Sequence, residues 1–88
     1  MNKVYPVIFR PQAVKDLQQL PAVHFLRIKR SIGELSKDPR PMGVKKLEGP
    51  IHRIRIGPWR VLYAIFDKEA QVTVLRIRRR NEKTYGNR

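Results

Sequence analysis

Residues 51–63 read Ile-His-Arg-Ile-Arg-Ile-Gly-Pro-Trp-Arg-Val-Leu-Tyr, and they form the centre of the fold that the sequence predicts. Its first half alternates strictly, so the isoleucines point to one face of an extended strand, and Arg53 and Arg55 point to the other. Gly-Pro signals a turn, and the β-branched and aromatic residues after it predict a return strand. We therefore expect a β-hairpin with one apolar face and one guanidinium face, to which Arg60 adds a third fixed charge.

The segment before the hairpin predicts one strand followed by two helices. Residues 4–9 alternate as a strand, and Pro6 places it at a sheet edge because proline cannot donate a ladder hydrogen bond. Pro11 suits the first turn of a helix, which ends before Pro21. A second helix from Ala22 carries an apolar stripe at helical spacing, so the two segments predict a helical hairpin with a basic outer face.

Two groups of turn-forming residues separate the predicted elements in the rest of the chain. Residues 38–43 predict a connecting loop, and 44–50 an extended approach to the hairpin. A second turn at 67–70 leads to a final strand over 72–77. We expect one α+β domain over residues 1–88: an N-terminal strand, a helical hairpin and a three-stranded antiparallel meander, with the helices packed on one sheet face. The expected sheet core is Val7, Phe9, Ile54, Ile56, Val61, Tyr63 and Ile65.

Composition narrows the class of protein. The chain has 88 residues, of which 41% are hydrophobic, and it lacks cysteine, which rules out disulfides and thiolate metal sites. Its two histidines lack metal-ligand spacing, so we expect neither a metal nor another cofactor. The longest apolar run is too short to span a membrane, and no signal-peptide segment opens the chain, so the expected location is cytoplasmic.

Charge is the outlying property. Twenty Lys and Arg against seven Asp and Glu give a net charge of +13. Such a field describes partners rather than fold, and its simplest partner is a polyanion, either a nucleic acid or a very acidic protein. The second half carries more of this charge, and the last strand runs into a basic tail at residues 76–85 that contains Tyr85.

Several of these residues together resemble the RelE/ParE superfamily of toxins. The resemblance covers essentially the whole chain, including the order of its elements. The matching residues are Tyr5, Val7 and Phe9 of the first strand, Lys46 and Leu47 of the approach, Arg53, Arg55, Gly57, Arg60, Leu62 and Tyr63 of the hairpin, and Arg78, Arg79 and Tyr85 of the tail.

The resemblance implies a function, a site and a partner. The RelE branch implies a metal-independent endoribonuclease that cuts mRNA in the ribosomal A site and is held inactive by an acidic antitoxin, in a complex whose stoichiometry is left open. The ParE branch implies instead a DNA gyrase inhibitor without nuclease activity. The positions matching the functional residues of RelE are Arg53, Arg55, Arg60, Arg79 and Tyr85, and we add Lys46, Arg76, Arg78, Arg80 and Lys83 as RNA-binding residues.

One departure from the family affects the chemistry. RelE-like toxins often carry lysines where this chain has Arg53 and Arg55, and arginine is always protonated in proteins, so no proton-transfer role carries over. Tyr85 is then the candidate base for the 2′-OH, and neighbouring arginines would lower its pKa from about 10. Arg60 and Arg79 would offset charge on the phosphate, while Arg53 and Arg55 hold the backbone. The alternative for Tyr85 is a tail aromatic that covers the sheet edge.

The aromatic residues of the hairpin have structural interpretations. Trp59 is placed either to stack on an RNA base or to pack at the hairpin edge, and we favour packing. His52 alternates with Ile54 onto the core-facing side, which favours a structural histidine, and Tyr63 is expected in the core. A plain basic nucleic-acid-binding module is a third reading of the chain, which the absence of a recognition-helix or stacking motif disfavours.

Overall fold

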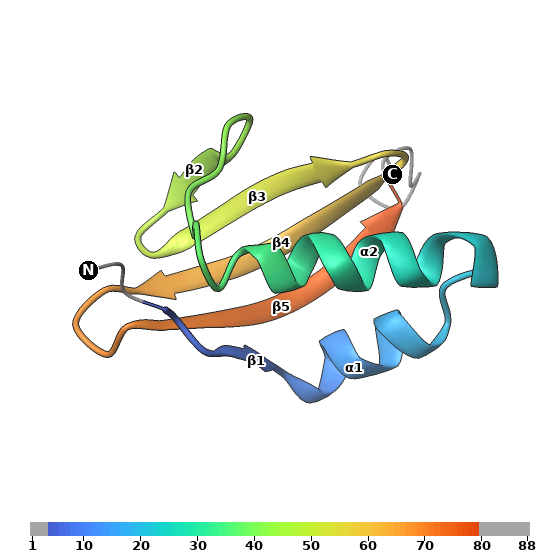
Figure 1. The fold of residues 1–88 in the computed structure, drawn as a ribbon, viewed down its shortest axis with the longest axis horizontal. Helices are drawn as coiled ribbons and strands as arrows, with labels where there is room; N and C mark the ends of the chain where they lie inside the picture. The colour runs from blue at the N-terminus through green and yellow to red at the C-terminus, as the bar shows by residue number, and fades with distance from the viewer. Residues whose placement is uncertain (1–3, 80–88) are drawn as a thin grey trace.

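The computed structural model describes residues 4–79, which form a five-stranded sheet and two helices (Figure 1). The strands lie in the order β1-β5-β4-β3-β2. In chain order the elements are β1 (Val7–Phe9), α1 (Pro11–Gln18), α2 (Ala22–Glu34), β2 (Lys45–Glu48), β3 (Ile51–Ile56), β4 (Trp59–Phe66) and β5 (Gln71–Arg79). The predicted α+β class is confirmed. Neither helix in this part of the chain is long and apolar enough to cross a membrane.

The β3–β4 hairpin forms where its alternation predicts. Ile56 pairs with Trp59 across the two-residue turn, and Arg55 pairs with Arg60 one step further along. Gly57 takes a positive φ of 60°, a conformation that costs little energy without a Cβ atom. A Cβ atom at Gly57 would also lie 2.9 Å from Nη1 of Arg27, so the end of this long side chain reaches from α2 to the turn.

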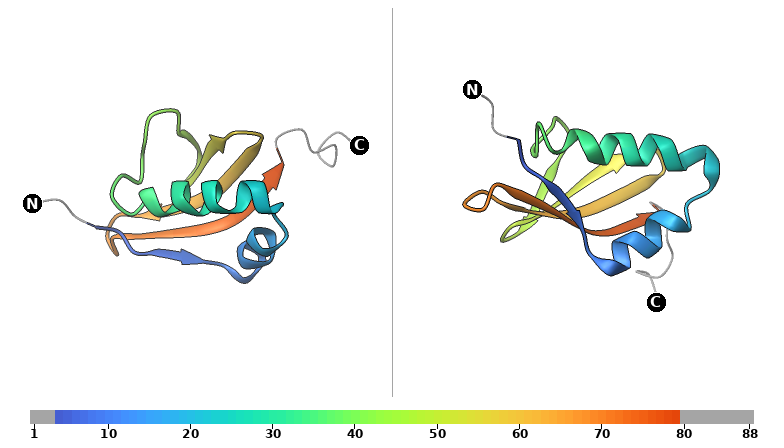
Figure 2. Two further views of the ribbon diagram at one scale, coloured as in Figure 1. Left: turned by 45° about the vertical axis from the view of Figure 1, so that its right-hand side comes forward. Right: turned by 60° about the horizontal axis from the view of Figure 1, so that its bottom comes forward.

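Figure 2 shows α2 lying across one face of the sheet, and the buried side chains of the core lie between the two. Ile28, Ile32 and Leu35 of the α2 stripe are buried against the sheet. Each aliphatic side chain buried in this way contributes about 1.5–3 kcal/mol. The predicted sheet core is confirmed, because Ile56, Val61, Tyr63 and Ile65 are buried, and Val7, Phe9 and Ile54 are partly buried against the same cluster.

The first helix lies beside β5 rather than over the sheet. β1 ends after Phe9, and α1 then follows the same β5 edge (Figure 1). The carboxylate of Asp16 accepts a hydrogen bond from the backbone N–H of Ile77 at 2.9 Å and another from Nε of Arg76 at 2.8 Å. The helix therefore supplies a side-chain acceptor to a strand edge that β1 is too short to cover.

Both edge strands differ from the expectation. The segment predicted as an approach contains β2, which pairs antiparallel with β3. The first strand is shorter than expected and runs parallel to β5, with Val7 opposite Val72. Its edge position is confirmed, and Pro6 contributes to it through its carbonyl, which accepts the N–H of Val72 at 2.9 Å. The meander thus forms the centre of the sheet, and two short strands flank it.

The loop between α2 and β2 is fastened to the β4–β5 end of the sheet. Arg40 donates two hydrogen bonds to Asp67, at 2.8 and 3.2 Å, and the Tyr5 hydroxyl donates a third at 2.9 Å. These hydrogen bonds lower the pKa of Asp67. The buried Tyr63 hydroxyl donates to the Pro39 carbonyl at 2.7 Å. The loop therefore delivers β2 to the edge of β3 in a fixed position.

Candidate nucleic-acid interface

Three arginines form a row across the sheet face that α2 leaves uncovered, which we call the outer face. Arg60 on β4 lies directly opposite Arg55 on β3 and directly opposite Arg78 on β5. Directly opposed residues share a face. The flanking row, Ile56, Trp59 and Arg79, belongs to the helix side because Ile56 and Trp59 are buried in the core. The predicted grouping of Arg53, Arg55 and Arg60 on one surface is therefore confirmed.

A second group of cations adjoins this row on the outer face. Arg53 lies two residues before Arg55 on the same strand, and Lys45 on β2 is directly opposite Arg53. Together with Gly43 these three residues line a pocket of about 260 Å³. Within residues 4–79, Glu48 is the only acidic residue in any strand, and it is paired with Ile51, away from the pocket.

The outer-face charges depend on a β-bulge. Leu62 pairs with Arg76 and the next residue, Tyr63, pairs with Val74, so Leu75 is an extra residue in β5. Because side chains alternate along a strand, this insertion reverses the faces of every residue beyond it. Arg76 and Arg78 thereby reach the outer face, whereas Arg79 goes to the helix side.

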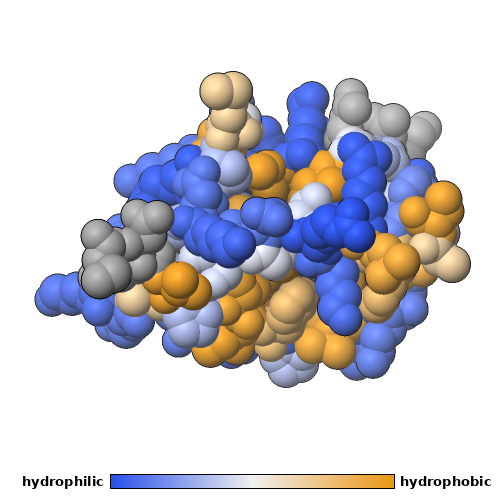
Figure 3. Space-filling view, in the orientation of Figure 1, coloured by the Kyte–Doolittle hydropathy of each residue, from blue (hydrophilic) through white to orange (hydrophobic). Residues whose placement is uncertain are grey.

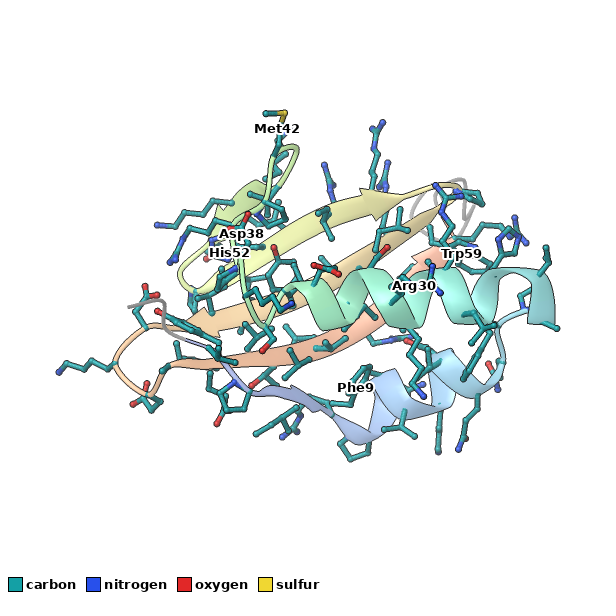
Figure 4. The ribbon with its side chains drawn as sticks, viewed as in Figure 1. Phe9, Arg30, Asp38, Met42, His52 and Trp59 are labelled. Carbon is teal, nitrogen blue, oxygen red and sulfur yellow. The ribbon has the colours of Figure 1, made fainter. Side chains whose placement is uncertain are left out.

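Arg79 packs against the aromatic end of the core instead of lying beside Arg60. Its guanidinium carbon is 4.7 Å from the centroid of the Trp59 ring, within the range of a cation–π interaction. The ring of His24 from α2 contacts Trp59 edge-on at 5.4 Å. Figure 4 shows Trp59 at the end of the sheet that carries the β3–β4 turn. Trp59 is only 8% exposed, so the packing interpretation is confirmed.

Two further candidates are drawn away from the outer-face row. Arg76 forms its ion pair with Asp16, which fastens α1 to β5. Lys46 is directly opposite His52, whose side chain is buried on the helix side. Strand alternation therefore separates Lys46 from Lys45. The sequence-based prediction missed Lys45, because the family resemblance matches Lys46 and Leu47 of this segment and only the pairing of β2 with β3 places Lys45 on the outer face.

His52 and Tyr63 are structural, as predicted. Their rings stack at 5.8 Å, and Nδ1 of His52 lies 2.8 Å from the Pro50 carbonyl oxygen. Burial raises the pKa of Tyr63 to about 12. Neither residue reaches the outer face. No group of three or more His, Asp or Glu residues within 4–79 is placed to hold a metal ion.

Three of the predicted site residues, Arg80, Lys83 and Tyr85, lie outside the described residues. Their proposed roles stay predictions. The described part of the site thus consists of guanidinium and ammonium groups on an open sheet face, and this chemistry binds and neutralises phosphate oxygens.

The helix side of the molecule has a different character. Figure 3 shows hydrophobic and hydrophilic residues intermixed over α2 and its surroundings. Val23 and Leu26 are 80% and 67% exposed there. Exposed apolar groups among basic residues suit contact with a protein better than contact with a nucleic acid backbone alone.

Comparison with known proteins identifies the family. Residues 7–84 match the model of the "ParE toxin of type II toxin-antitoxin system, parDE". A Methanocaldococcus jannaschii protein named "Putative toxin RelE1" is 31% identical over 88 residues, covering 94% of this chain and 97% of its own length.

Solved structures agree with this assignment. A chain of the archaeal RelE–RelB complex from Pyrococcus horikoshii superposes with a TM-score of 0.81 at 32% identity, covering 90% of this chain and 98% of that one. A chain of the RelBE2 toxin–antitoxin complex from Mycobacterium tuberculosis gives 0.78 at 30% identity, covering 91% and 95%. This chain therefore belongs to the RelE/ParE superfamily, the toxins of type II toxin–antitoxin systems.

Proposed function

We propose that this toxin is an endoribonuclease that cleaves mRNA in the ribosomal A site and so inhibits translation. The observation that carries the proposal is the arginine row Arg55–Arg60–Arg78 on the open outer face, flanked by Arg53 and Lys45. Such a surface suits an extended polyanion, because several phosphates can meet fixed positive charges along it.

The row suits the transition state of RNA cleavage. The deprotonated 2′-oxygen attacks the scissile phosphorus and the P–O5′ bond breaks, which leaves a 2′,3′-cyclic phosphate and a 5′-oxygen that takes up a proton. Negative charge builds up on the phosphate oxygens during this step, and the planar guanidinium fork can bind two of them at once. Charge that the fold has already placed needs no reorganisation during the reaction, and loss of one such donor typically costs about 3 kcal/mol of barrier. Arg60 sits at the centre of the row, so we assign it the scissile phosphate.

Proton transfer must come from another group, because arginine cannot accept a proton at physiological pH. Tyr85 is the proposed base for the 2′-OH, and it follows the arginine-rich strand in sequence. We further propose that Arg79 acts with it from the end of β5, beside Trp59. A ribosome that orients the mRNA would supply the alignment that a charged surface alone does not provide.

We propose an acidic antitoxin as the partner that silences the toxin. The net charge of +13 favours such a protein, and the P. horikoshii and M. tuberculosis relatives were solved as toxin–antitoxin complexes. An acidic segment over the outer face would neutralise the same cations that bind RNA. The exposed apolar residues of α2 would provide a second contact.

The alternative function is inhibition of DNA gyrase without nuclease activity. It is favoured by the matched family description, which names the ParE toxin of parDE systems. The arginine row favours RNA chemistry over this alternative, because a protein target does not require three guanidinium groups in direct opposition.

A translating cell-free extract separates the two functions. We expect the native chain to generate mRNA ends in codon phase only while ribosomes are translating, and Arg60→Ala to lower the cleavage rate about 100-fold, equivalent to the loss of one preorganised donor. Lys68→Ala, in the β4–β5 turn, is the charge-matched control and should cut normally. Intact mRNA together with loss of DNA supercoiling by gyrase would refute the ribonuclease and support the alternative.

A further inference from the structure

The pocket beside the arginine row brings together cations from two strands and a loop. Lys45 and Arg53 are direct cross-strand partners, Arg55 is the next outer-face residue of β3, and Gly43 closes the pocket from the loop. Gly43 has a positive φ of 91°, and nothing lies within 4 Å of where its Cβ would be. A side chain at position 43 would therefore meet no steric obstacle, although the positive φ favours glycine.

Lys45, Arg53 and Arg55 form no ion pair with an acidic side chain of residues 4–79. Among residues 4–79, no side-chain hydrogen bond, ion pair or ring contact involves Lys45, Arg53 or Arg55, in contrast to Arg40 and Arg76. Like charges placed directly opposite each other on a sheet destabilise it. The fold thus holds Lys45 against Arg53 at a cost in stability, and a bound anion would remove this cost.

We propose that Lys45, Arg53 and Arg55 form a second phosphate subsite, which holds a backbone phosphate of single-stranded RNA that is not the scissile one. The inference rests on the proposed ribonuclease function for its substrate. Lys45 is in register with Leu62, two strands away, and Arg60 lies two residues further along β4, so Lys45 and Arg60 are about 12 Å apart at the usual strand spacing and rise. The pocket and the centre of the row therefore serve separate phosphates. Arg55 stands between them and is shared.

The assignment gives Lys45 a positioning role. Its ammonium group acts as a point charge toward one phosphate, while the Arg53 fork fixes the orientation of the same group. Two contacts at a non-reacting phosphate would set the register of the strand, so that the scissile phosphate arrives at Arg60. Lys46, the next residue, cannot substitute for Lys45 because it lies on the helix side of the sheet.

RNA binding at different salt concentrations tests the subsite directly. The probe is a fluorescent 12-nucleotide single-stranded RNA made of 2′-deoxy residues at alternate positions to slow cleavage, and the measurement is anisotropy between 50 and 200 mM salt. Each phosphate contact contributes about 0.7 to the slope of log affinity against log salt for single strands. We expect Lys45→Ala to reduce the slope by about 0.7 and Lys45→Arg to restore it, with Lys68→Ala unchanged.

A double substitution asks whether Lys45 and Arg53 share one phosphate. If they do, the combined effect of Lys45→Ala and Arg53→Ala will be smaller than the sum of the single effects. Thermal unfolding of each variant checks that it folds, and removal of either charge should leave the midpoint equal or higher. A salt slope for Lys45→Ala equal to that for Lys68→Ala would overturn the subsite. The subsite would also be overturned if Lys45→Ala lowered the affinity for an acidic antitoxin peptide and left the affinity for RNA unchanged.

The subsite and the proposed function fail in different ways. Normal mRNA cleavage in the extract with an unchanged Lys45→Ala slope would overturn the subsite alone. Absence of cleavage by the native chain, with the slope still reduced in Lys45→Ala, would overturn the ribonuclease while retaining the subsite as an RNA-binding feature.

Discussion

Replacement of Asp16 by alanine tests how α1 is attached to the sheet. The Asp16 side chain is 9% exposed and accepts hydrogen bonds from the Ile77 N–H at 2.9 Å and from Arg76 at 2.8 and 3.4 Å. Asp16→Ala leaves the Ile77 N–H without its acceptor at a buried strand position. An unsatisfied buried donor costs about 1–3 kcal/mol. The Arg76 side chain is 37% exposed and can rehydrate, so its ion pair contributes at most about 1 kcal/mol.

We therefore expect Asp16→Ala to lower the free energy of unfolding by about 2–3 kcal/mol, or the melting temperature by roughly 10–20 °C for a domain of this size. Urea unfolding followed by the fluorescence of the single tryptophan, Trp59, measures it. Asp16→Asn keeps an acceptor for the Ile77 N–H and should cost less. If Arg76→Gln destabilised the protein as much as Asp16→Ala, the ion pair rather than the hydrogen bond to the Ile77 N–H would hold the helix, contrary to this expectation.

The same carboxylate gives the stability a pH dependence. Burial acts to raise the pKa of Asp16, but the hydrogen bonds from Arg76 and Ile77 outweigh burial and lower it. A group with a lowered pKa in the folded state stabilises the protein above its ordinary pKa of about 3.9. This contribution is lost as the pH falls below that value. The Asp16→Asn variant should therefore have a lower free energy of unfolding at neutral pH, and this free energy should fall less steeply as the pH is lowered below about 4.

Three further outcomes follow from other contacts. Burial raises the pKa of Tyr63 to about 12, so the protonated hydroxyl stabilises the fold below pH 10, and this contribution of about 2–3 kcal/mol is lost between pH 10 and 12. The free energy of unfolding of Tyr63→Phe should therefore fall less steeply over that pH range. Asp67→Asn weakens an exposed clasp and should move the urea midpoint less than Asp16→Asn does. Arg79→Gln removes the cation beside Trp59 and should change its emission spectrum while costing about 0.5–1 kcal/mol in urea unfolding.

The centre of the sheet could be predicted because its determinants are local. Period-two alternation from residue 52 to 56 sets the face of each side chain, and Gly57 with Pro58 sets the turn that aligns the two strands. Correct alignment then places Arg60 opposite Arg55 without any further information. The structural roles of Trp59 and His52 follow from the same alternation.

The sheet edges could not be predicted with equal detail because their pairing is non-local. β1 pairs with a strand more than sixty residues away, and nothing in residues 4–9 specifies a parallel partner. Residues 45–48 become a strand only because the fastened loop delivers them to the free edge of β3. Lys45 acquires a face, and with it a candidate role, from that pairing alone.

The bulge at Leu75 explains why Arg78, and not the predicted Arg79, lies opposite Arg60 on the outer face. Before the bulge, the core takes Val72 and Val74, and with unbroken alternation it would next take Arg76. The extra residue, Leu75, shifts the alternation by one position, so Ile77 instead of Arg76 turns into the core after Val74. The same phase shift turns Arg78 outward to lie opposite Arg60. One inserted residue therefore both completes the core and completes the arginine row, which links the stability of this strand to the charge pattern of the outer face.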